Sequence, residues 1–478
     1  MRRRTFTNED QINFSKFSGD YNPIHLDSVA ARRLMGGVSV AHGVHAVFWA
    51  LDCLAEKQKK QLGFQSLSVQ FLKPIVVGEE VECRLIQCAT EKTVLSLWTL
   101  GEEAVHVELS LDLNCTDNVN NIYDSCPAKT EVEIVDKKDI EGISGKLDLH
   151  MTSEDLCAWF PALAKTFCWQ QLASILATSR LVGMKCPGMY SRYSSMRLCF
   201  NNPESGSSAM SYSVKFFDER FSLLSIEIHS PILKGNIEAF LVSPPQSQPA
   251  GAAITKAVEK EEFKGQRAVV IGGSRGLGEL TAKLLSAGGA EVVITYNRGE
   301  DDARRVVSEM DSSAWQPRCL QYDVITCRKG IAGEFSQEWL PTHIYYFPTP
   351  VIFSGVKNKF YNDRFIIFCD YYVGAFLKVF EPFYERGTRC FFFPSSIAIE
   401  EQPADMGEYV AAKTAGESLC GFLEKYYKNS VIYRPRLPRL PTDQTASLIP
   451  VKTHNSIPVM LDHLRTFQKK CLTKEQQI

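Results

Sequence analysis

A glycine-rich stretch, residues 269–279, constrains this chain more than any other part of its sequence. The apolar residues 268–271 predict a short buried strand, and residues 279–285 have the apolar spacing of a helix. Between them, Gly272 and Gly276 let the backbone approach a ligand closely, because a Cβ atom would hold the chain away. A strand, a glycine turn and a helix in this order direct backbone N–H groups at a phosphate. A simple tight turn is the alternative interpretation of the glycines alone.

A second apolar strand, residues 291–296, completes a βαβ unit. An acidic residue at the end of this strand would bind the ribose hydroxyls of NAD, but Arg298 stands there, and Arg275 lies within the glycine stretch. Two guanidinium groups near that ribose favour a 2′-phosphate, so we predict NADPH as the cofactor. Solvated surface charge is the alternative interpretation of both arginines.

Further along, Tyr409 and Lys413 are separated by one helical turn. This spacing puts both side chains on one face of a helix, where an ammonium group would lower the pKa of the phenol and favour proton transfer. Ser396 lies thirteen residues upstream, just after the apolar run 390–393, and its hydroxyl would hold a carbonyl oxygen beside the tyrosine.

Taken together, residues 265–446 resemble a short-chain dehydrogenase/reductase, specifically a ketoreductase. The resemblance implies an α/β, Rossmann-like, doubly wound parallel sheet. It also implies that Tyr409 is the general acid, that Lys413 holds the ribose and that Ser396 orients the carbonyl. Residues 438–442 resemble the stretch after the sixth strand of that family. The implied cofactor-binding residues are Gly272, Ser274, Arg275, Gly276, Leu277, Gly278, Arg298 and Asp323, the last of which would contact the adenine.

Three departures from that family put its proton relay and substrate pocket in question. Residues 346–350 replace the usual Asn-Asn-Ala-Gly, and the catalytic asparagine of the next helix is replaced by Asp370 or Tyr371. The C-terminal substrate lid is also short.

Near the N-terminus, residues 17–27 combine Gly19, Asn22 and Pro23, which predict a structured loop rather than a regular helix. The loop carries a carboxylate, Asp20, five residues before an imidazole, His25. An acid and a base on one rigid loop can share a water molecule, one activating it and the other passing a proton to carbon.

Gly43 precedes an apolar helix predicted over residues 44–54, and a glycine N–H at a helix start is a ready oxyanion donor. Residues 1–115 resemble the MaoC-like, R-specific enoyl-CoA hydratases, which have a hotdog fold. The resemblance rests on Ser18-Gly19-Asp20, Asn22-Pro23, His25, His42-Gly43, Val69, Phe71, Pro74 and Gly78. It implies that Asp20 and His25 are the catalytic pair, that Gly43 polarises the thioester carbonyl and that Asn22 orients the loop. We interpret His42 as a structural residue and His45 as a satisfied neighbour.

The remaining segments suggest how these parts are joined. We predict a linker over 116–150 and a second, non-catalytic hotdog half over 151–243, with a separate thioester-binding module as the alternative. Within that half, Ser179-Arg180 would either contact a phosphopantetheine or carrier protein or, as we favour, present a solvated arginine. Residues 244–264 predict a second linker, because they begin with a Pro- and Gln-rich run. The tail, 447–478, contains a predicted short helix over 459–468.

Composition narrows the class of protein. The chain has 478 residues, 45% hydrophobic and 23% charged, which is typical of a soluble globular protein of about three domains. A formal net charge of −2 gives no reason to expect nucleic acid or a membrane as partner. The 15 cysteines include no Cys-xx-Cys pair, so we predict reduced thiols in a cytoplasmic protein, with neither a metal site nor a disulfide framework.

The two resemblances together imply a fold of an α+β hotdog pair followed by the parallel sheet. Our leading hypothesis is a bifunctional 3-ketoacyl-thioester reductase and 3-hydroxyacyl-thioester dehydratase that acts in fatty-acid or polyketide-like biosynthesis. Its partners would be acyl-CoA or acyl-carrier-protein thioesters, and we expect a homo-oligomer. One alternative is a dehydratase whose reductase half binds NADP without turnover, and another is a non-catalytic scaffold that binds acyl thioesters.

Overall fold

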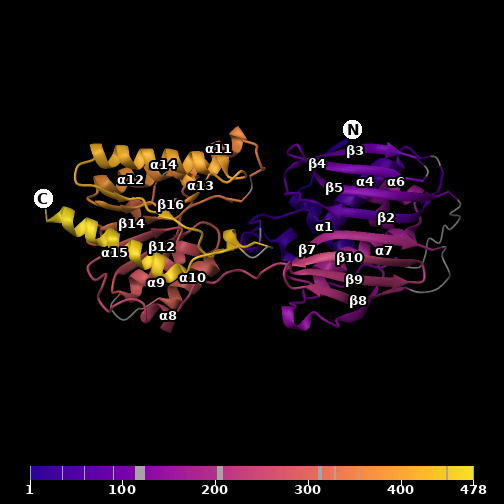
Figure 1. Cartoon of the computed structure of the whole chain (residues 1–478), viewed down its shortest axis with the longest axis horizontal. Coiled ribbons are helices and arrows are strands. Elements are labelled where there is room, and N and C mark those ends of the chain that lie inside the picture. The colour runs from indigo at the N-terminus through magenta and orange to yellow at the C-terminus, as the bar shows by residue number, and fades with distance from the viewer. Residues whose placement is uncertain are drawn as a thin grey trace. The chain divides into compact units, whose positions relative to one another are not determined.

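The computed structural model describes residues 2–34, 36–58, 60–89, 91–113, 124–201, 208–310, 315–327, 330–353, 355–447 and 451–476. The chain forms two compact units, shown in Figure 1. Unit 1 comprises Met1–Pro244 with Ser447–Pro450, and unit 2 comprises Pro245–Ala446 with Val451–Ile478.

A ten-stranded antiparallel sheet forms the framework of unit 1, in the order β1-β3-β4-β5-β2-β7-β10-β9-β8-β6. Its two halves join where β2 pairs with β7, with Leu67 opposite Leu198. Residues on one face alternate with exposed residues, as expected for a sheet that is covered on one side only. The strands are β1 (Arg2–Thr5), β2 (Gly63–Phe71), β3 (Glu80–Cys88), β4 (Thr93–Thr99), β5 (Glu102–Asp112), β6 (Ser144–Asp148), β7 (Ser191–Phe200), β8 (Ala209–Asp218), β9 (Leu223–Ser230) and β10 (Leu233–Leu241).

One long apolar helix from each half packs on this sheet, α4 (Gly43–Ala55) from the first and α7 (Trp169–Arg180) from the second, and both share one hydrophobic core with the strands. In Figure 1 these helices lie behind the sheet. A π-helical segment, η2 (Leu181–Lys185), continues α7. The other helices of this unit are α1 (Asn8–Ser18), α2 (Pro23–Leu26), α3 (Ser28–Ala31), α5 (Ser153–Trp159) and α6 (Pro161–Thr166).

Three details of unit 1 differ from the sequence-based expectations. The predicted linker over 116–150 contains β6, which pairs with β8. A further strand, β10, completes the second half and was not predicted. The loop over 17–27 contains the short helix α2, because Pro23 occupies its first turn, where a proline needs no N–H partner.

Unit 2 contains a six-stranded, fully parallel sheet in the order β13-β12-β11-β14-β15-β17. This is the strand order of a doubly wound dinucleotide-binding fold, as predicted. The strands are β11 (Arg267–Ile271), β12 (Glu291–Tyr296), β13 (Arg318–Gln321), β14 (His343–Tyr346), β15 (Cys390–Phe392) and β17 (Val431–Tyr433). A separate two-stranded sheet pairs β16 (Ser395–Ser396) with β18 (Arg436–Leu437).

Helices cover both faces of the parallel sheet (Figure 1). Val269 and Ile271 of β11 point into one core with α11, α12 and α14, whereas Ala268 and Val270 point into the other with α9, α10 and α15. The helices are α8 (Ala252–Thr255), α9 (Gly276–Ala287), α10 (Glu300–Glu309), α11 (Asn362–Cys369), α12 (Ala375–Glu385), α13 (Ala398–Glu401), α14 (Gly407–Tyr426) and α15 (Ser456–Glu475), with a π-helical segment η4 (Asp370–Gly374).

The C-terminal helix is longer than predicted. A short helix was expected over 459–468, but α15 spans Ser456–Glu475. Its length follows from an apolar stripe through Met460, Leu464, Phe467 and Cys471, all buried against the sheet. The predicted linker over 244–264 likewise contributes to this core, because Phe263 is fully buried in it.

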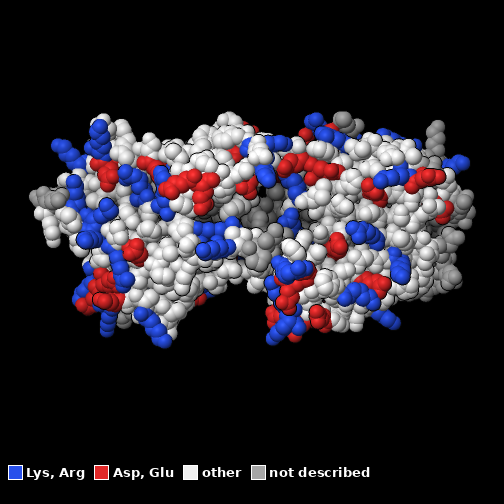
Figure 2. Space-filling view, in the orientation of Figure 1, with Lys and Arg blue, Asp and Glu red and all other residues white. Residues whose placement is uncertain are grey.

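Charges of both signs are interspersed over the face of each unit that Figure 2 shows. Among the described residues, no helix combines the length and the apolar character needed to cross a membrane.

Candidate functional sites

The loop between α1 and α3 brings Asp20 and His25 together. Ligand atoms of Asp20, His25 and His42 all lie within 4.8 Å of one another. Helix α1 ends at Ser18 and is capped by Gly19, whose φ of 75° favours glycine, and Asp20 follows directly. His25 lies in α2, the single helical turn that begins at Pro23.

Residues from the second half of unit 1 hold the Asp20 carboxylate. Ser179 of α7 donates a hydrogen bond from its hydroxyl to Asp20 Oδ2 at 2.7 Å, and the backbone N–H of Asn22 donates to Oδ1 at 3.2 Å. Gly183 of η2 lies so close that a Cβ atom on it would be 2.2 Å from Asp20 Oδ1. The carboxylate therefore fits only because residue 183 has no side chain.

Asn22 anchors the loop to the same second half. Its side-chain amide donates to the carbonyl oxygens of Gly183 at 2.9 Å and Gly188 at 3.1 Å, while its Oδ1 accepts from the N–H of Ile24. One side chain thus caps α2 and joins the two halves.

The imidazole of His25 is held in a defined tautomer. Its Nδ1 lies 2.8 Å from the carbonyl oxygen of Val40, which can only accept, so Nδ1 carries the proton and Nε2 keeps its lone pair. The ring stacks on His42 with centroids 3.8 Å apart. His42 in turn donates from Nε2 to the backbone carbonyl of Asp20 at 3.0 Å, so this fully buried histidine positions both members of the pair.

Burial brings the pKa values of Asp20 and His25 closer together. Desolvation raises the pKa of Asp20, although the nearby His25 and the Ser179 hydrogen bond act in the opposite direction. Desolvation also lowers the pKa of His25, opposed by Asp20 and Val40. A carboxyl with a raised pKa and an imidazole with a lowered one exchange a single proton at little cost.

Gly43 is the first residue of α4, so its N–H has no partner within the helix. A Cβ atom there would lie 2.7 Å from the ring of Phe71, which explains the glycine. The backbone N–H is thus at a helix start, where the helix dipole favours a partial negative charge.

In unit 2, the glycine turn between β11 and α9 has the expected form. Gly272 and Gly276 have φ values of 75° and 58°, and a Cβ atom on Gly278 would lie 2.3 Å from the carbonyl oxygen of Gly272. Helix α9 begins at Gly276, and a Cβ atom on this glycine would lie 3.7 Å from the side chain of Thr442. Together with the buried Ser274 and with Leu277, this turn fits the pyrophosphate of a dinucleotide.

The charged residues around this turn differ in how far they are buried and in which groups they contact. Arg298 is exposed after β12. Burial opposes ionisation of Asp323, but hydrogen bonds from Ile325 and Thr326, with a smaller contribution from the charge of Arg298, lower the pKa of its carboxyl. Arg275 is partly buried, with Nη1 3.6 Å from a carboxylate oxygen of Asp443. The Asp323 carboxylate accepts hydrogen bonds from Ile325 N–H at 2.9 Å and from the Thr326 hydroxyl at 2.8 Å.

Ser396, Tyr409 and Lys413 meet at the carboxyl end of β15. Ser396 hydrogen-bonds to the Tyr409 hydroxyl and lowers its pKa, but burial outweighs this effect and raises the pKa of Tyr409 to about 12. Burial also lowers the pKa of Lys413 to about 7. The Lys413 amine donates to the carbonyl of Pro394 at 2.7 Å and lies 3.8 Å from the ring centroid of Tyr372.

Comparisons with known proteins find two families in this chain. Residues 1–94 match the family described as MaoC like domain, and residues 266–331 match the family described as short chain dehydrogenase. The chain has a MaoC-like domain and, later, a short-chain dehydrogenase domain.

The Protein MaoC of Klebsiella aerogenes is 28% identical over 104 residues, which cover 21% of this chain and 30% of that protein. The chain therefore spans less than a third of the length of this curated relative. Two solved structures are also similar to the later part of the chain. A short-chain dehydrogenase from Shigella flexneri is 17% identical, with a TM-score of 0.38, over 43% of this chain and 87% of that one. A short-chain dehydrogenase from Burkholderia cenocepacia J2315, in complex with NADP, is 22% identical, with a TM-score of 0.33, over 38% and 77%.

Several sequence-based interpretations of the MaoC-like unit need correction. Arg180 is not solvated: it is 8% exposed and bonds through Nη2 to the carbonyl of Asp148. Ser179 donates a hydrogen bond from its hydroxyl to the Asp20 carboxylate, a contact that the sequence did not predict. His45 is not a satisfied neighbour, because both ring nitrogens are buried without a hydrogen-bond partner and the ring stacks on Phe14. Burial lowers the pKa of His45 to about 3, so it remains neutral.

Two interpretations of the dehydrogenase domain also change. The pKa of Tyr409 is raised, not lowered as expected, because burial dominates and the Lys413 amine is hydrogen-bonded elsewhere. In the π-helical segment that contains Asp370 and Tyr371, it is the ring of Tyr372 that lies 3.8 Å from the Lys413 amine. The π-helical turn η4 shifts the register of the helix by one residue, which the sequence spacing did not reveal.

Proposed function

We propose that this chain is a bifunctional enzyme that reduces 3-ketoacyl thioesters with NADPH and dehydrates the resulting 3-hydroxyacyl thioesters. The first unit would act as a hotdog pair with one active site, and the second as the ketoreductase. Tethering the two steps raises the local concentration of the intermediate. Acyl-CoA or acyl-carrier-protein thioesters are the substrate class, and we expect a homo-oligomer.

Dehydration removes the C2 proton and the C3 hydroxyl of the substrate. The Asp20–His25 pair must hold one proton at the start, so that one member accepts the C2 proton while the other protonates the leaving hydroxyl. The opposed pKa shifts of Asp20 and His25 favour this sharing. The N–H of Gly43 would stabilise the charge that develops on the thioester oxygen.

Ketone reduction needs a hydride, which bound NADPH supplies, and a proton. Tyr409 would donate that proton to the carbonyl oxygen, and Ser396, bonded to the same hydroxyl, would hold the substrate oxygen. Arg298 and Arg275 would bind the 2′-phosphate, and the turn at Gly272, Gly276 and Gly278 would bind the pyrophosphate. Lys413 would hold the ribose.

The observation that most strongly supports the dehydratase is the arrangement around Asp20. The Asp20 carboxylate is 2% exposed, lies within 4.8 Å of the neutral His25 and is enclosed by Ser179 and Gly183. Burying a carboxylate is costly, and this one has no evident structural role.

Crossed variants of the full-length protein test the proposal. The wild type should hydrate crotonyl-CoA and oxidise NADPH in the presence of acetoacetyl-CoA. Asp20→Asn should reduce the hydration rate on the order of 10²–10⁴-fold and leave ketone reduction unchanged. Tyr409→Phe should reduce the rate of ketone reduction and leave hydration unchanged. Loss of both activities in either variant, with the fold intact, would argue against two independent sites.

The position of Tyr372 supports a second candidate, a dehydratase with an impaired reductase half. Its ring lies 3.8 Å from the Lys413 amine, and the catalytic asparagine of the family is missing from this helix. Stopped-flow measurements distinguish the candidates: NADPH that binds, quenching protein fluorescence, but is not oxidised by acetoacetyl thioesters would favour the second.

A further inference from the structure

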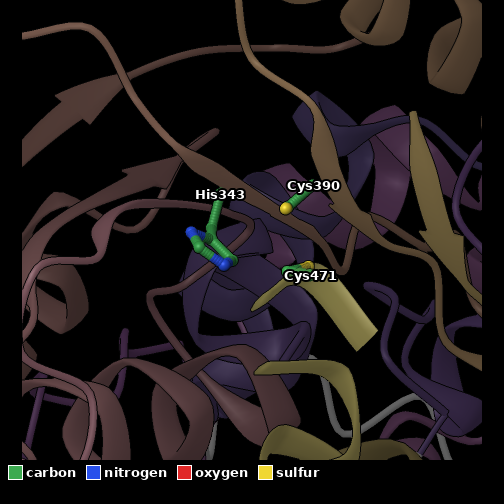
Figure 3. Close-up of side chains that lie close together, drawn as sticks. All are labelled: His343, Cys390 and Cys471. Carbon is green, nitrogen blue, oxygen red and sulfur yellow. The ribbon is translucent and has the colours of Figure 1, made fainter. Parts of the chain in front are cut away.

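Three side chains that are far apart in the sequence meet on the side of the parallel sheet that α15 covers. His343 begins β14, Cys390 begins β15 and Cys471 lies in α15 (Figure 3). One ligand atom from each lies within 4.8 Å of the other two. His343 and Cys390 are direct partners in the register of the two strands, so they share one face of the sheet. The sequence analysis found no metal site because no short spacing links these residues.

All three side chains are buried: His343 is 6% exposed, Cys390 3% and Cys471 2%. Aromatic rings enclose them, since Phe467 meets the His343 ring edge-on with centroids 5.6 Å apart and Tyr345 stacks at 6.4 Å. The Tyr345 hydroxyl is directed away, towards Gln266. Two aromatic rings therefore pack against the His343 imidazole.

A nitrogen of the histidine lacks a hydrogen-bond partner. His343 Nε2 is buried, and none of the described residues bonds to it. Its Nδ1 lies 2.8 Å from the Thr342 hydroxyl, which accepts from Arg267 N–H at 2.9 Å and lies 3.4 Å from the Arg267 carbonyl. The Thr342 hydroxyl can accept from the Arg267 N–H and from His343 Nδ1–H, and it can donate to the Arg267 carbonyl. His343 Nε2 then carries no proton, and its lone pair is available to bind a metal ion. In metal sites, the ring nitrogen of a histidine that does not bind the metal usually donates a hydrogen bond, and this bond orients the ring.

We infer that His343, Cys390 and Cys471 form a structural Zn²⁺ site that fastens α15 to the sheet. Thiolate sulfur and imidazole nitrogen are the donors that zinc prefers. Two thiolates neutralise a divalent ion, and a neutral complex suits apolar surroundings, whereas Cu⁺ would leave a buried negative charge. Zn–S bonds of about 2.3 Å and Zn–N bonds of about 2.0–2.1 Å place donors about 3.5–3.8 Å apart, so small side-chain rotations close the site. A water molecule would complete the tetrahedron.

The place of the site in the fold explains why its role is structural. His343 and Cys390 lie at the amino ends of their strands, whereas the glycine turn and Ser396 lie at the carboxyl ends. In sheets of this kind the reaction occurs at the carboxyl ends. The inference is therefore independent of the proposed reductase activity.

Metal content of the full-length protein tests this inference. We expect one tightly bound Zn²⁺ per chain after purification, and Co²⁺ titrated into the metal-free protein should give a thiolate-to-cobalt charge-transfer band. Cys390→Ala and His343→Asn should each weaken binding by on the order of 100-fold. Cys319→Ala, which removes a partly exposed thiol from β13 of the same unit, should bind as the wild type does.

The wild type alone can overturn the inference, so a variant that fails to fold does not weaken the test. A metal-free protein that binds no Co²⁺ through thiolate, or one recovered with a Cys390–Cys471 disulfide in place of the metal, would contradict it. Zinc should also raise the melting temperature of the wild type and leave that of Cys390→Ala unchanged.

Discussion

The two candidate sites are built in different ways. In the MaoC-like unit, side chains hold one another directly: Ser179 bonds to Asp20, Asn22 bonds to backbone carbonyls of the other half, and His42 lies between Asp20 and His25. In the dehydrogenase domain, backbone conformation provides the arrangement, through the left-handed Gly272 and Gly276 and the start of α9.

This contrast determines which changes should disturb each site. The first depends on contacts between residues that are about 160 positions apart, so substitutions at these contacts in the half without the catalytic pair should reduce its activity. The second depends on one local turn and on single residues around it. Distant substitutions in the dehydrogenase domain should therefore affect stability more than chemistry.

Gly183→Ala should give the largest effect among substitutions outside the catalytic pair. Alanine is favourable in a helical backbone, and Gly183 has no positive φ, so the fold should tolerate it. Its Cβ would displace the Asp20 carboxylate, and a displacement of about 1 Å can reduce turnover on the order of 10²-fold. Crotonyl-CoA hydration measures the effect.

Gly374→Ala is the matched control, because this glycine also lies in a π-helical segment and nothing lies within 4 Å of a Cβ there. It should leave hydration unchanged. Equal hydration rates for the two variants and the wild type would mean that Asp20 is not held by the second half.

Ser179→Ala should have a smaller effect on the same site. The lost hydrogen bond stabilises the anion, so the pKa of Asp20 should rise further and the acid limb of the hydration pH profile should move to higher pH. A hydrogen bond to a charged group contributes about 1.5–3 kcal/mol, which predicts a loss of about tenfold or more in kcat/KM. Ser174→Ala on the same helix, whose hydroxyl bonds only to the carbonyl of Gln170, should leave the profile unmoved.

The same contrast explains what could be predicted from the sequence. Asp20, His25 and Gly43 were recognisable because they lie in short, contiguous motifs whose backbone conformations depend on Gly19 and Pro23. The glycine turn of unit 2 follows from a local apolar and glycine pattern in the same way, whereas its doubly wound sheet was predicted from the resemblance to the short-chain dehydrogenases/reductases. The structure places these residues as the local patterns suggest.

The sequence singled out Ser179 only for a possible contact with a carrier, and it did not single out Gly183. Their role beside Asp20 could not be predicted, since the pairing of β2 with β7 brings their helix to Asp20. Their segment reads as an ordinary apolar helix. The one available signal was a glycine within that helix, because an interior helical glycine is unfavourable unless something packs against it. Tyr372 was missed for a different reason, since the π-helical turn changes which side chain faces Lys413.

Arg298→Ala should affect the dehydrogenase domain modestly. Arg298 is exposed, so solvent screens its attraction for a 2′-phosphate, and we expect about 1 kcal/mol, or about a fivefold increase in the Kd for NADPH. The affinity for NADH should not change. Arg304→Ala is the control, because this exposed arginine on α10 pairs with Glu300 one helical turn away. A parallel loss of NADPH and NADH affinity would show that Arg298 does not read the phosphate.

Lys413 offers the finest comparison, because burial lowers its pKa to about 7 from an ordinary value of 10.5. Between these two values the unfolded chain binds a proton at Lys413 that the folded protein does not. The free energy of unfolding therefore rises with pH across this window relative to a protein without the amine. Denaturant unfolding of wild type and Lys413→Met between pH 7 and 10 measures the difference in their free energies of unfolding. The contributions of the other titrating groups cancel in this difference. A wild type that gains no stability over Lys413→Met as the pH rises would mean that the amine stays charged beside Tyr372, held by the aromatic ring and the Pro394 carbonyl.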